Sequence, residues 1–122
     1  MVEVICDTSF LIHIATNRIK NIDNLDTEIG TLNFVIPEVV INELSKLSEK
    51  TEKIKQIKCT LNYIKKFKII PLNGIFADKV ILDYISKNRT IVATMDIKLK
   101  NKIKSLESSV ISIHNQKIIL EN

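Results

Sequence analysis

Continuous apolar runs alternate along this chain with segments in which apolar residues recur every three or four positions. The runs predict buried strands, because strands covered on both faces are apolar throughout. The predicted strands lie at residues 2–6, 34–36, 68–72, 90–94, 110–113 and 118–120. The periodic segments predict helices, which begin at residues 8 and 37 and also cover about 51–66, 76–87 and 97–105. Within the polar stretch 17–31, the spacing of Ile22, Leu25 and Ile29 predicts at most a short helix.

This alternation favours an α/β fold with a parallel sheet that helices cover on both faces. With 122 residues and no repeat or Pro/Gly-rich linker, the chain is expected to form a single domain over residues 1–122. In such sheets, ligands bind beyond the carboxyl ends of the strands. The polar side chains at those ends are therefore the ones to examine.

The composition limits the class of protein. No apolar stretch is long enough to span a membrane, and the first residues do not resemble a signal peptide. Two cysteines, Cys6 and Cys59, provide neither a disulfide framework nor the Cys/His spacing of a zinc site. A cytoplasmic protein with no membrane association is expected.

The charge is unevenly distributed. Residues 1–45 carry seven acids and two bases, whereas residues 46–122 carry sixteen bases and seven acids, which together give the net charge of +4. A basic surface suits a nucleic-acid partner, and a solvated lysine-rich surface is an equally good explanation. The candidate phosphate contacts are Lys55, Lys58, Lys98, Lys100, Lys102 and Lys104.

Four carboxylates occupy positions that need explaining. Asp7 follows the first predicted strand directly, Asp96 lies two residues after Thr94 at the end of the fourth, and Asp78 begins a helix. Helix capping accounts for each of these three when it is taken singly. Glu43 lies on or beside the apolar stripe of its helix, where an unpaired carboxylate is costly, although a head group that reaches solvent is also possible.

If the four acids meet at one edge of the sheet, their repulsion destabilises the fold unless a cation is bound. No histidine stands beside these oxygen ligands, and Cys6 lies inside the predicted strand and is interpreted as a core residue, so the set favours Mg²⁺ or Mn²⁺ over zinc.

Four segments carry a resemblance to a known family. They are VICDTSFL (4–11), IPEVVINELSKL (36–47), FADKVILDYI (76–85) and IVATMDIKLK (91–100), and the Thr-x-Asp after an apolar strand is the most specific of them. The chain resembles PIN domains over nearly its whole length, and within that family it is most similar to VapC-like toxins and to the rRNA-processing branch.

The resemblance implies a three-layer α/β/α sandwich and an endoribonuclease that hydrolyses RNA phosphodiester bonds with Mg²⁺ or Mn²⁺. It implies that Asp7, Glu43, Asp78 and Asp96 are the catalytic and metal-binding acids. It also implies that Thr8, Ser9 and Thr94 support them with hydroxyl groups. An antitoxin partner and a homodimer are further implications.

The chain departs from the family pattern at three positions. Close relatives often have a second Asp where Lys79 stands, and commonly Asn where Ser9 and Met95 stand. Two alternatives are an rRNA-processing nuclease and an RNA-binding PIN module with weak catalysis. A phosphoacceptor receiver domain shares the α/β architecture but requires an acidic pair after the first strand, and Asp7 stands alone there.

Overall fold

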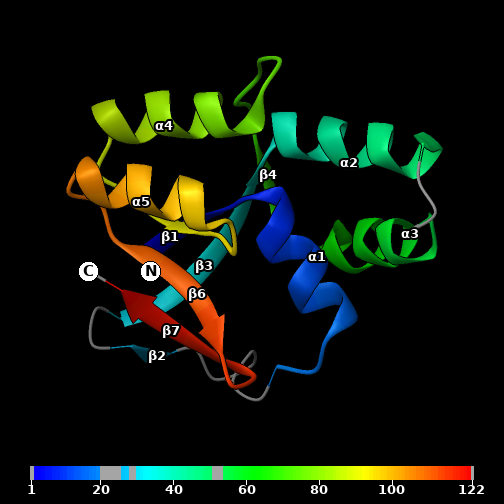
Figure 1. The fold of residues 1–122 in the computed structure, drawn as a ribbon, viewed down its shortest axis with the longest axis horizontal. Coiled ribbons are helices and arrows are strands. Elements are labelled where there is room, and N and C mark those ends of the chain that lie inside the picture. Colours follow the sequence, from blue (N-terminus) through cyan, green and yellow to red (C-terminus); the bar gives the residue numbers. More distant parts are fainter. Residues whose placement is uncertain (1, 20–25, 28–29, 51–53, 122) are drawn as a thin grey trace.

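A computed structural model describes residues 2–19, 26–27, 30–50 and 54–121 of the chain. In that part, the strands form one sheet in the order β2-β3-β1-β5-β6-β7, and β4 also pairs with β3, at residues 35–37. Helices pack against the sheet on both sides, with α4 and α5 at the upper left of Figure 1 and α1 and α3 at the right. The predicted three-layer α/β/α architecture is confirmed.

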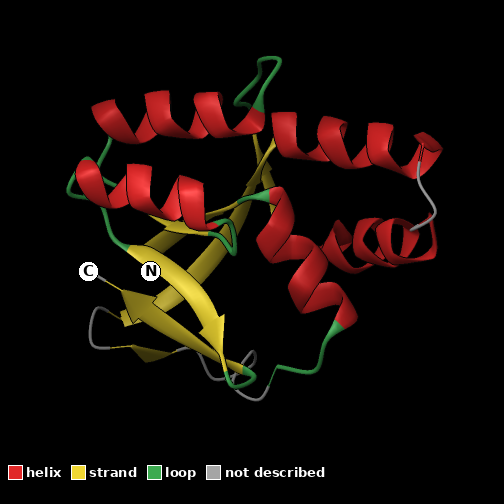
Figure 2. Ribbon diagram, viewed as in Figure 1, coloured by secondary structure: helices red, strands yellow, loops and turns green. Residues whose placement is uncertain are grey.

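The order of elements follows the predicted alternation of strands and helices (Figure 2). The strands are β1 (Val2–Cys6), β2 (Asp26–Thr27), β3 (Gly30–Pro37), β4 (Lys68–Ile70), β5 (Ile91–Ala93), β6 (Val110–His114) and β7 (Lys117–Glu121). The helices are α1 (Thr8–Thr16), α2 (Glu38–Lys50), α3 (Ile54–Tyr63) with the 3₁₀ turn η1 (Ile64–Lys66), α4 (Ala77–Lys87) and α5 (Ile97–Ser105).

The centre of the sheet is parallel and fully buried. β1 pairs in parallel with β3 on one side and with β5 on the other, and β5 pairs in parallel with β6. Val4, Ile5 and Cys6 of β1 have no exposed surface, as expected of a strand covered on both faces.

Three features differ from the sequence predictions. β3 begins at Gly30 rather than Phe34, because its first residues pair with the antiparallel β2. The short helix expected within 17–31 is wrong where the structure describes that segment, since 26–27 and 30–31 are strand, and residues 20–25 and 28–29 lie outside the described part. The last strand is antiparallel to its neighbour β6, so the sheet is mostly and not wholly parallel.

Within the described residues, no helix is both long enough and apolar enough to cross a membrane.

Candidate active site

The carboxyl ends of β1 and β5 lie side by side in the sheet. Cys6 of β1 is in register with Ala93 of β5, and the next N–H along the chain, that of Asp7, donates to the Ala93 carbonyl at 3.0 Å. The Thr94 N–H continues the pattern by donating to Ile111 of β6 at 3.0 Å. The backbone ladder therefore fixes Asp7 and Thr94 at the same edge.

The carboxylate of Asp7 is buried and accepts hydrogen bonds from three donor groups. Asp7 is only 6% exposed. Its Oδ1 accepts the Phe10 N–H at 2.9 Å, which caps α1, and the Ser9 hydroxyl at 2.9 Å. Its Oδ2 accepts the Thr94 hydroxyl at 2.5 Å. These donors compensate for the water that burial removes from the carboxylate.

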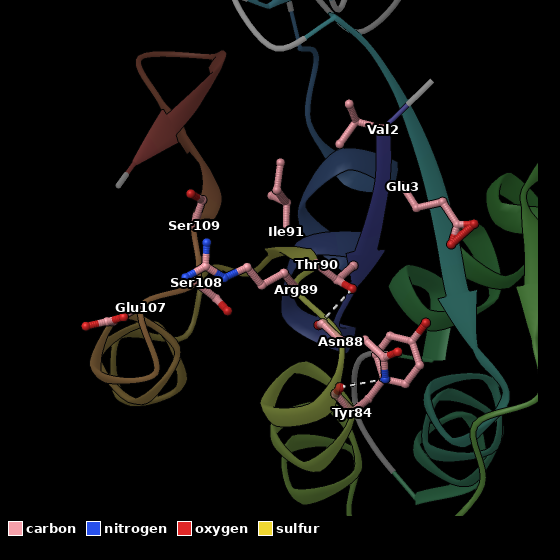
Figure 3. A pocket seen from close by; sticks show the side chains of 10 residues that line it. All are labelled: Val2, Glu3, Tyr84, Asn88, Arg89, Thr90, Ile91, Glu107, Ser108 and Ser109. Carbon is pink, nitrogen blue, oxygen red and sulfur yellow. Dashed lines mark hydrogen bonds between the residues drawn. The ribbon is translucent and has the colours of Figure 1, made fainter.

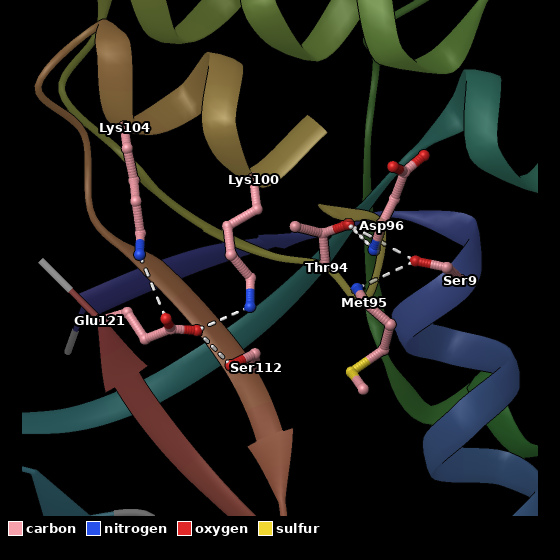
Figure 4. Close-up of polar contacts among 8 residues, drawn as sticks. All are labelled: Ser9, Thr94, Met95, Asp96, Lys100, Lys104, Ser112 and Glu121. Carbon is pink, nitrogen blue, oxygen red and sulfur yellow. Dashed lines mark hydrogen bonds and ion pairs between the residues drawn. The ribbon is translucent and has the colours of Figure 1, made fainter. Parts of the chain in front are cut away.

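The backbone after β5 fixes the direction of both hydroxyl groups. Ser9 Oγ accepts the Met95 N–H at 3.0 Å, and Thr94 Oγ1 accepts the Asp96 N–H at 3.0 Å (Figure 4). Each hydroxyl has one proton, and Asp7 is the acceptor for it. The network thus ties the start of α1 to the β5–α5 connection.

The surroundings of Asp7 shift two pKa values. Burial raises the pKa of Asp7 above its ordinary value, hydrogen bonds from Thr94, Phe10 and Ser9 oppose the rise, and the charge of Asp96 adds to it. Burial, followed by the neighbouring charge of Asp7, raises the pKa of the Cys6 thiol well above its usual range. Cys6 is therefore a protonated core residue at neutral pH and not a nucleophile.

The other three carboxylates reach the edge from different helices and are less confined. Glu43 of α2 is partly buried, and its Oε1 accepts the Thr8 hydroxyl at 2.9 Å. Asp96 is exposed and caps α5, since its Oδ1 accepts the N–H groups of Lys98 at 2.9 Å and Leu99 at 3.2 Å. Asp78 is exposed in the first turn of α4, where its Oδ1 accepts the Lys79 N–H at 2.9 Å.

The four acids line one cavity of about 330 Å³. Its described lining consists of Asp7, Thr8, Ser9, Ile12, Glu43, Ala77, Asp78, Asp96 and Leu99. None of the ion pairs found among the described residues involves these four acids. A cavity lined by four carboxylates, none of them in an ion pair with another described residue, has the charge and the oxygen ligands that a hard divalent cation requires.

The carboxylates nevertheless do not form a ready-made cluster. No three Asp, Glu, His or Cys side chains in the described part of the chain are close enough together to hold a metal ion. Asp7 is fixed by its hydrogen bonds, whereas Asp78 and Asp96 are exposed. The oxygen ligands of these acids are of the type that a divalent metal ion prefers. To bind one ion together, the exposed side chains of Asp78 and Asp96 would have to move toward Asp7, which is fixed.

The six candidate lysines do not share one role. Lys100 and Lys104 of α5 make ion pairs with Glu121 of β7, at 2.9 and 3.1 Å (Figure 4). Lys98 and Lys102 are exposed on α5, while Lys55 and Lys58 are exposed on α3. Within the described residues, none of the six lines the acidic cavity.

A larger cavity, of about 550 Å³, lies at the opposite edge of the sheet, by the amino ends of β1 and β5 (Figure 3). Its lining includes Glu3, Tyr84, Arg89 and Ser109. It contains none of the site residues predicted from the sequence, and its mixed charges provide no set of metal ligands. Size alone therefore does not identify the reactive site.

Sequence reasoning missed the apolar part of the acidic cavity. Ile12, Ala77 and Leu99 line it beside the acids. Leu99 lies three residues after Asp96 on the inward side of α5, a spacing that could have identified it. No local pattern identifies Ile12.

Comparisons with known proteins agree with this geometry. The chain matches the family described as PIN like domain over residues 4–116. It is 29% identical to Ribonuclease VapC4 of Methanocaldococcus jannaschii over 127 residues, which cover 96% of this chain and 94% of that protein. Its fold is similar to the structure of the PIN domain endonuclease Utp24, with a TM-score of 0.81 and 27% identity, covering 98% of this chain and 90% of the other.

Proposed function

The chain belongs to the PIN-like domain family, and on that premise we propose that it is an endoribonuclease dependent on Mg²⁺ or Mn²⁺. The main support for the proposal is the cavity at the carboxyl edge of the sheet. It is lined by four carboxylates that come from four different parts of the fold. Both named relatives are nucleases, one a ribonuclease and the other an endonuclease, which supports RNA as the substrate.

The proposed metal ligands are Asp7, Glu43, Asp78 and Asp96. When bound, the cation would supply Lewis-acid stabilisation of the scissile phosphate and activation of water. Asp7 is the fixed ligand of the set, because three of its contacts are shorter than 3 Å and hold it in one orientation. Thr8, Ser9 and Thr94 are positioning residues that act through Glu43 and Asp7.

No side chain of the cavity serves as a nucleophile in this proposal. The Thr8 hydroxyl donates to Glu43, the hydroxyls of Ser9 and Thr94 donate to Asp7 and accept backbone N–H groups, and the buried thiol of Cys6 is protonated. Water is therefore the attacking group, and one of the three carboxylates that are less buried than Asp7, namely Glu43, Asp78 or Asp96, accepts its proton.

The proposal is tested with purified protein and a fluorescently labelled single-stranded RNA. Asp96→Asn removes one charge and keeps a good helix cap, so cleavage should fall to background while the melting temperature changes little. Asp83→Asn is the matched control, because Asp83 lies on the exposed surface of α4 and its recorded ion pair is with Lys87 of the same helix. Equal loss of cleavage in the two variants would contradict the assignment of the site.

The first biological role to test is that of the toxin in a type II toxin–antitoxin pair, with an antitoxin protein as partner. Induced expression of the wild type should arrest growth of a bacterial host, and Asp96→Asn should not. Cleavage of RNA in vitro without growth arrest would favour the alternative role in rRNA processing. Binding of RNA without cleavage would favour the other alternative, an RNA-binding module with weak catalysis.

A further inference from the structure

A second hollow adjoins the acidic cavity and shares Glu43 with it. It also measures about 330 Å³. Its described lining consists of Val39, Asn42, Glu43, Ser45, Lys46, Gly74 and Ile75, and we call it the α2 groove. One wall is helix α2 and the other is the connection between β4 and α4. The groove therefore lies next to the acidic cavity, with Glu43 at their common border.

The α2 wall presents a polar face with varied chemistry. Val39, Asn42, Glu43 and Lys46 recur at helical spacing, so they form one stripe along α2. Val39 is buried, whereas Asn42 and Lys46 are exposed. Lys46 takes part in none of the ion pairs formed among the described residues. The stripe offers an amide that can both donate and accept hydrogen bonds, and an ammonium suited to a phosphate.

The opposite wall presents an apolar side chain to solvent. Ile75 is 81% exposed, more than any other exposed large hydrophobic residue found in the described part of the chain. Its neighbour Gly74 lies so close to α4 that a Cβ there would clash with Val80 Cγ2. The absence of a side chain at Gly74 thus lets the connection approach α4 closely, next to the position where Ile75 lines the groove.

We propose that the α2 groove binds the nucleotide next to the scissile phosphate of a single-stranded RNA. The base packs on Ile75, Asn42 makes hydrogen bonds with the edge of the base, and Lys46 contacts a phosphate. This inference rests on the proposed function, because the position of the groove beside the acidic cavity, with Glu43 lining both, is what selects an RNA strand as the occupant. Proteins that bind single strands commonly contact the phosphates, the edges of the bases and the faces of the bases, the last most often with aromatic side chains; here the aliphatic Ile75 takes that place.

The packing of a base on position 75 can be measured by fluorescence. The chain contains no tryptophan, so Ile75→Trp introduces a single reporter at an exposed position. In Ca²⁺ buffer, with the RNA verified intact on a gel, an eight-nucleotide oligouridylate should quench its emission. A ribose-phosphate octamer without bases should quench it several-fold less. Ile119→Trp on the outer strand β7 is the control and should not respond.

The phosphate contact is tested through the salt dependence of binding. Lys46→Ala should lower the slope of log affinity against log salt concentration by roughly 0.7, the value for one phosphate contact to a single strand. Lys87→Ala at the far end of α4 is the matched control and should leave the slope unchanged. Asn42→Ala should change the relative affinities for oligomers of U, A and C rather than weaken all of them equally.

The outcomes separate this inference from the proposed function. Absent quenching together with an unchanged salt slope in Lys46→Ala overturns the subsite, while metal-dependent cleavage abolished by Asp96→Asn would still support the nuclease. Base-dependent quenching without cleavage would support the subsite and reject the nuclease. A blue shift in the emission of the Ile75→Trp variant with rising protein concentration and no RNA would identify a second copy of the chain as the occupant and overturn the proposal.

Discussion

Replacing Thr94 by valine should destabilise the fold and disable the site through Asp7. Thr94 has no exposed surface, and its hydroxyl donates to Asp7 Oδ2 and accepts the Asp96 N–H. A hydrogen bond to a charged group contributes about 1.5–3 kcal/mol, and an unsatisfied buried partner costs about 1 kcal/mol or more. Thr94→Val should therefore lower the free energy of unfolding by about 2–4 kcal/mol.

The assay is urea or thermal unfolding of wild type, Thr94→Val and Thr94→Ser in EDTA. For a domain of this length, 1 kcal/mol corresponds to a shift of about 4 °C, so Thr94→Val should melt roughly 8–15 °C lower. Thr94→Ser keeps the hydroxyl and loses one methyl group, which should cost only about 1 kcal/mol. Its cleavage rate should stay near that of the wild type. If the free energy of unfolding of Thr94→Val lies within about 0.5 kcal/mol of the wild-type value, the hydrogen bonds around Asp7 do not stabilise the fold to the extent expected.

Three further predictions follow from the structure. Mn²⁺ at a hundredfold excess over its dissociation constant should stabilise the wild type by roughly 2.7 kcal/mol in a thermal scan. The Asp96→Asn variant should be stabilised less. If Mn²⁺ stabilises neither protein, the assignment of the metal ligands is wrong. Hydrogen bonds from Lys100, Ser112 and Lys104 lower the pKa of Glu121 from 4.5 to about 2, so its ionised form contributes stability that is present above pH 4.5 and lost as the pH falls toward 2. Because about a quarter of that side chain is exposed, solvent screening reduces the contribution to roughly 1 kcal/mol, and Glu121→Gln should unfold with less pH dependence in that range, as followed by circular dichroism. Gly74→Ala should lower the melting temperature, since the added Cβ would clash with Val80 Cγ2, whereas an unchanged melting temperature would show that the connection moves freely.

Local pattern was enough to predict most of the fold, because each central element carries its own boundaries. Residues 2–6 are an apolar run closed by Asp7, and the helix predicted over 97–105 begins directly after the capping Asp96. The two features that local pattern missed are both hairpins between strands that are close in sequence. β3 extends back to Gly30 because β2 pairs with it. The antiparallel β6–β7 hairpin turns through Asn115 and Gln116, both at positive φ, and Asn at such a turn was the available signal.

The site could be predicted only in part, because some of its contacts depend on partners on other elements of the fold. Asp7 and Asp96 follow strands whose carboxyl ends meet at one edge, so their proximity follows from the topology. The roles of Lys100 and Lys104 do not, because their partner Glu121 lies on β7, and only the packing of α5 beside that strand brings the charges together. The groove residues Asn42 and Lys46 had no distinguishing pattern, since they are ordinary polar positions on an amphipathic helix.

Capping and metal binding are compatible roles for the same acids. Asp7 caps α1, Asp96 caps α5, and Asp78 lies in the first turn of α4, so three carboxylates occupy the positive ends of three helix dipoles. Each helix favours the ionised form of its own acid, which offsets part of the repulsion among acids that share a cavity. Asparagine retains the cap and removes the charge, whereas alanine removes both. Because the two roles separate in this way, loss of metal stabilisation in an Asn variant that still folds can be assigned to the missing charge, and the additional destabilisation in the Ala variant to the missing cap.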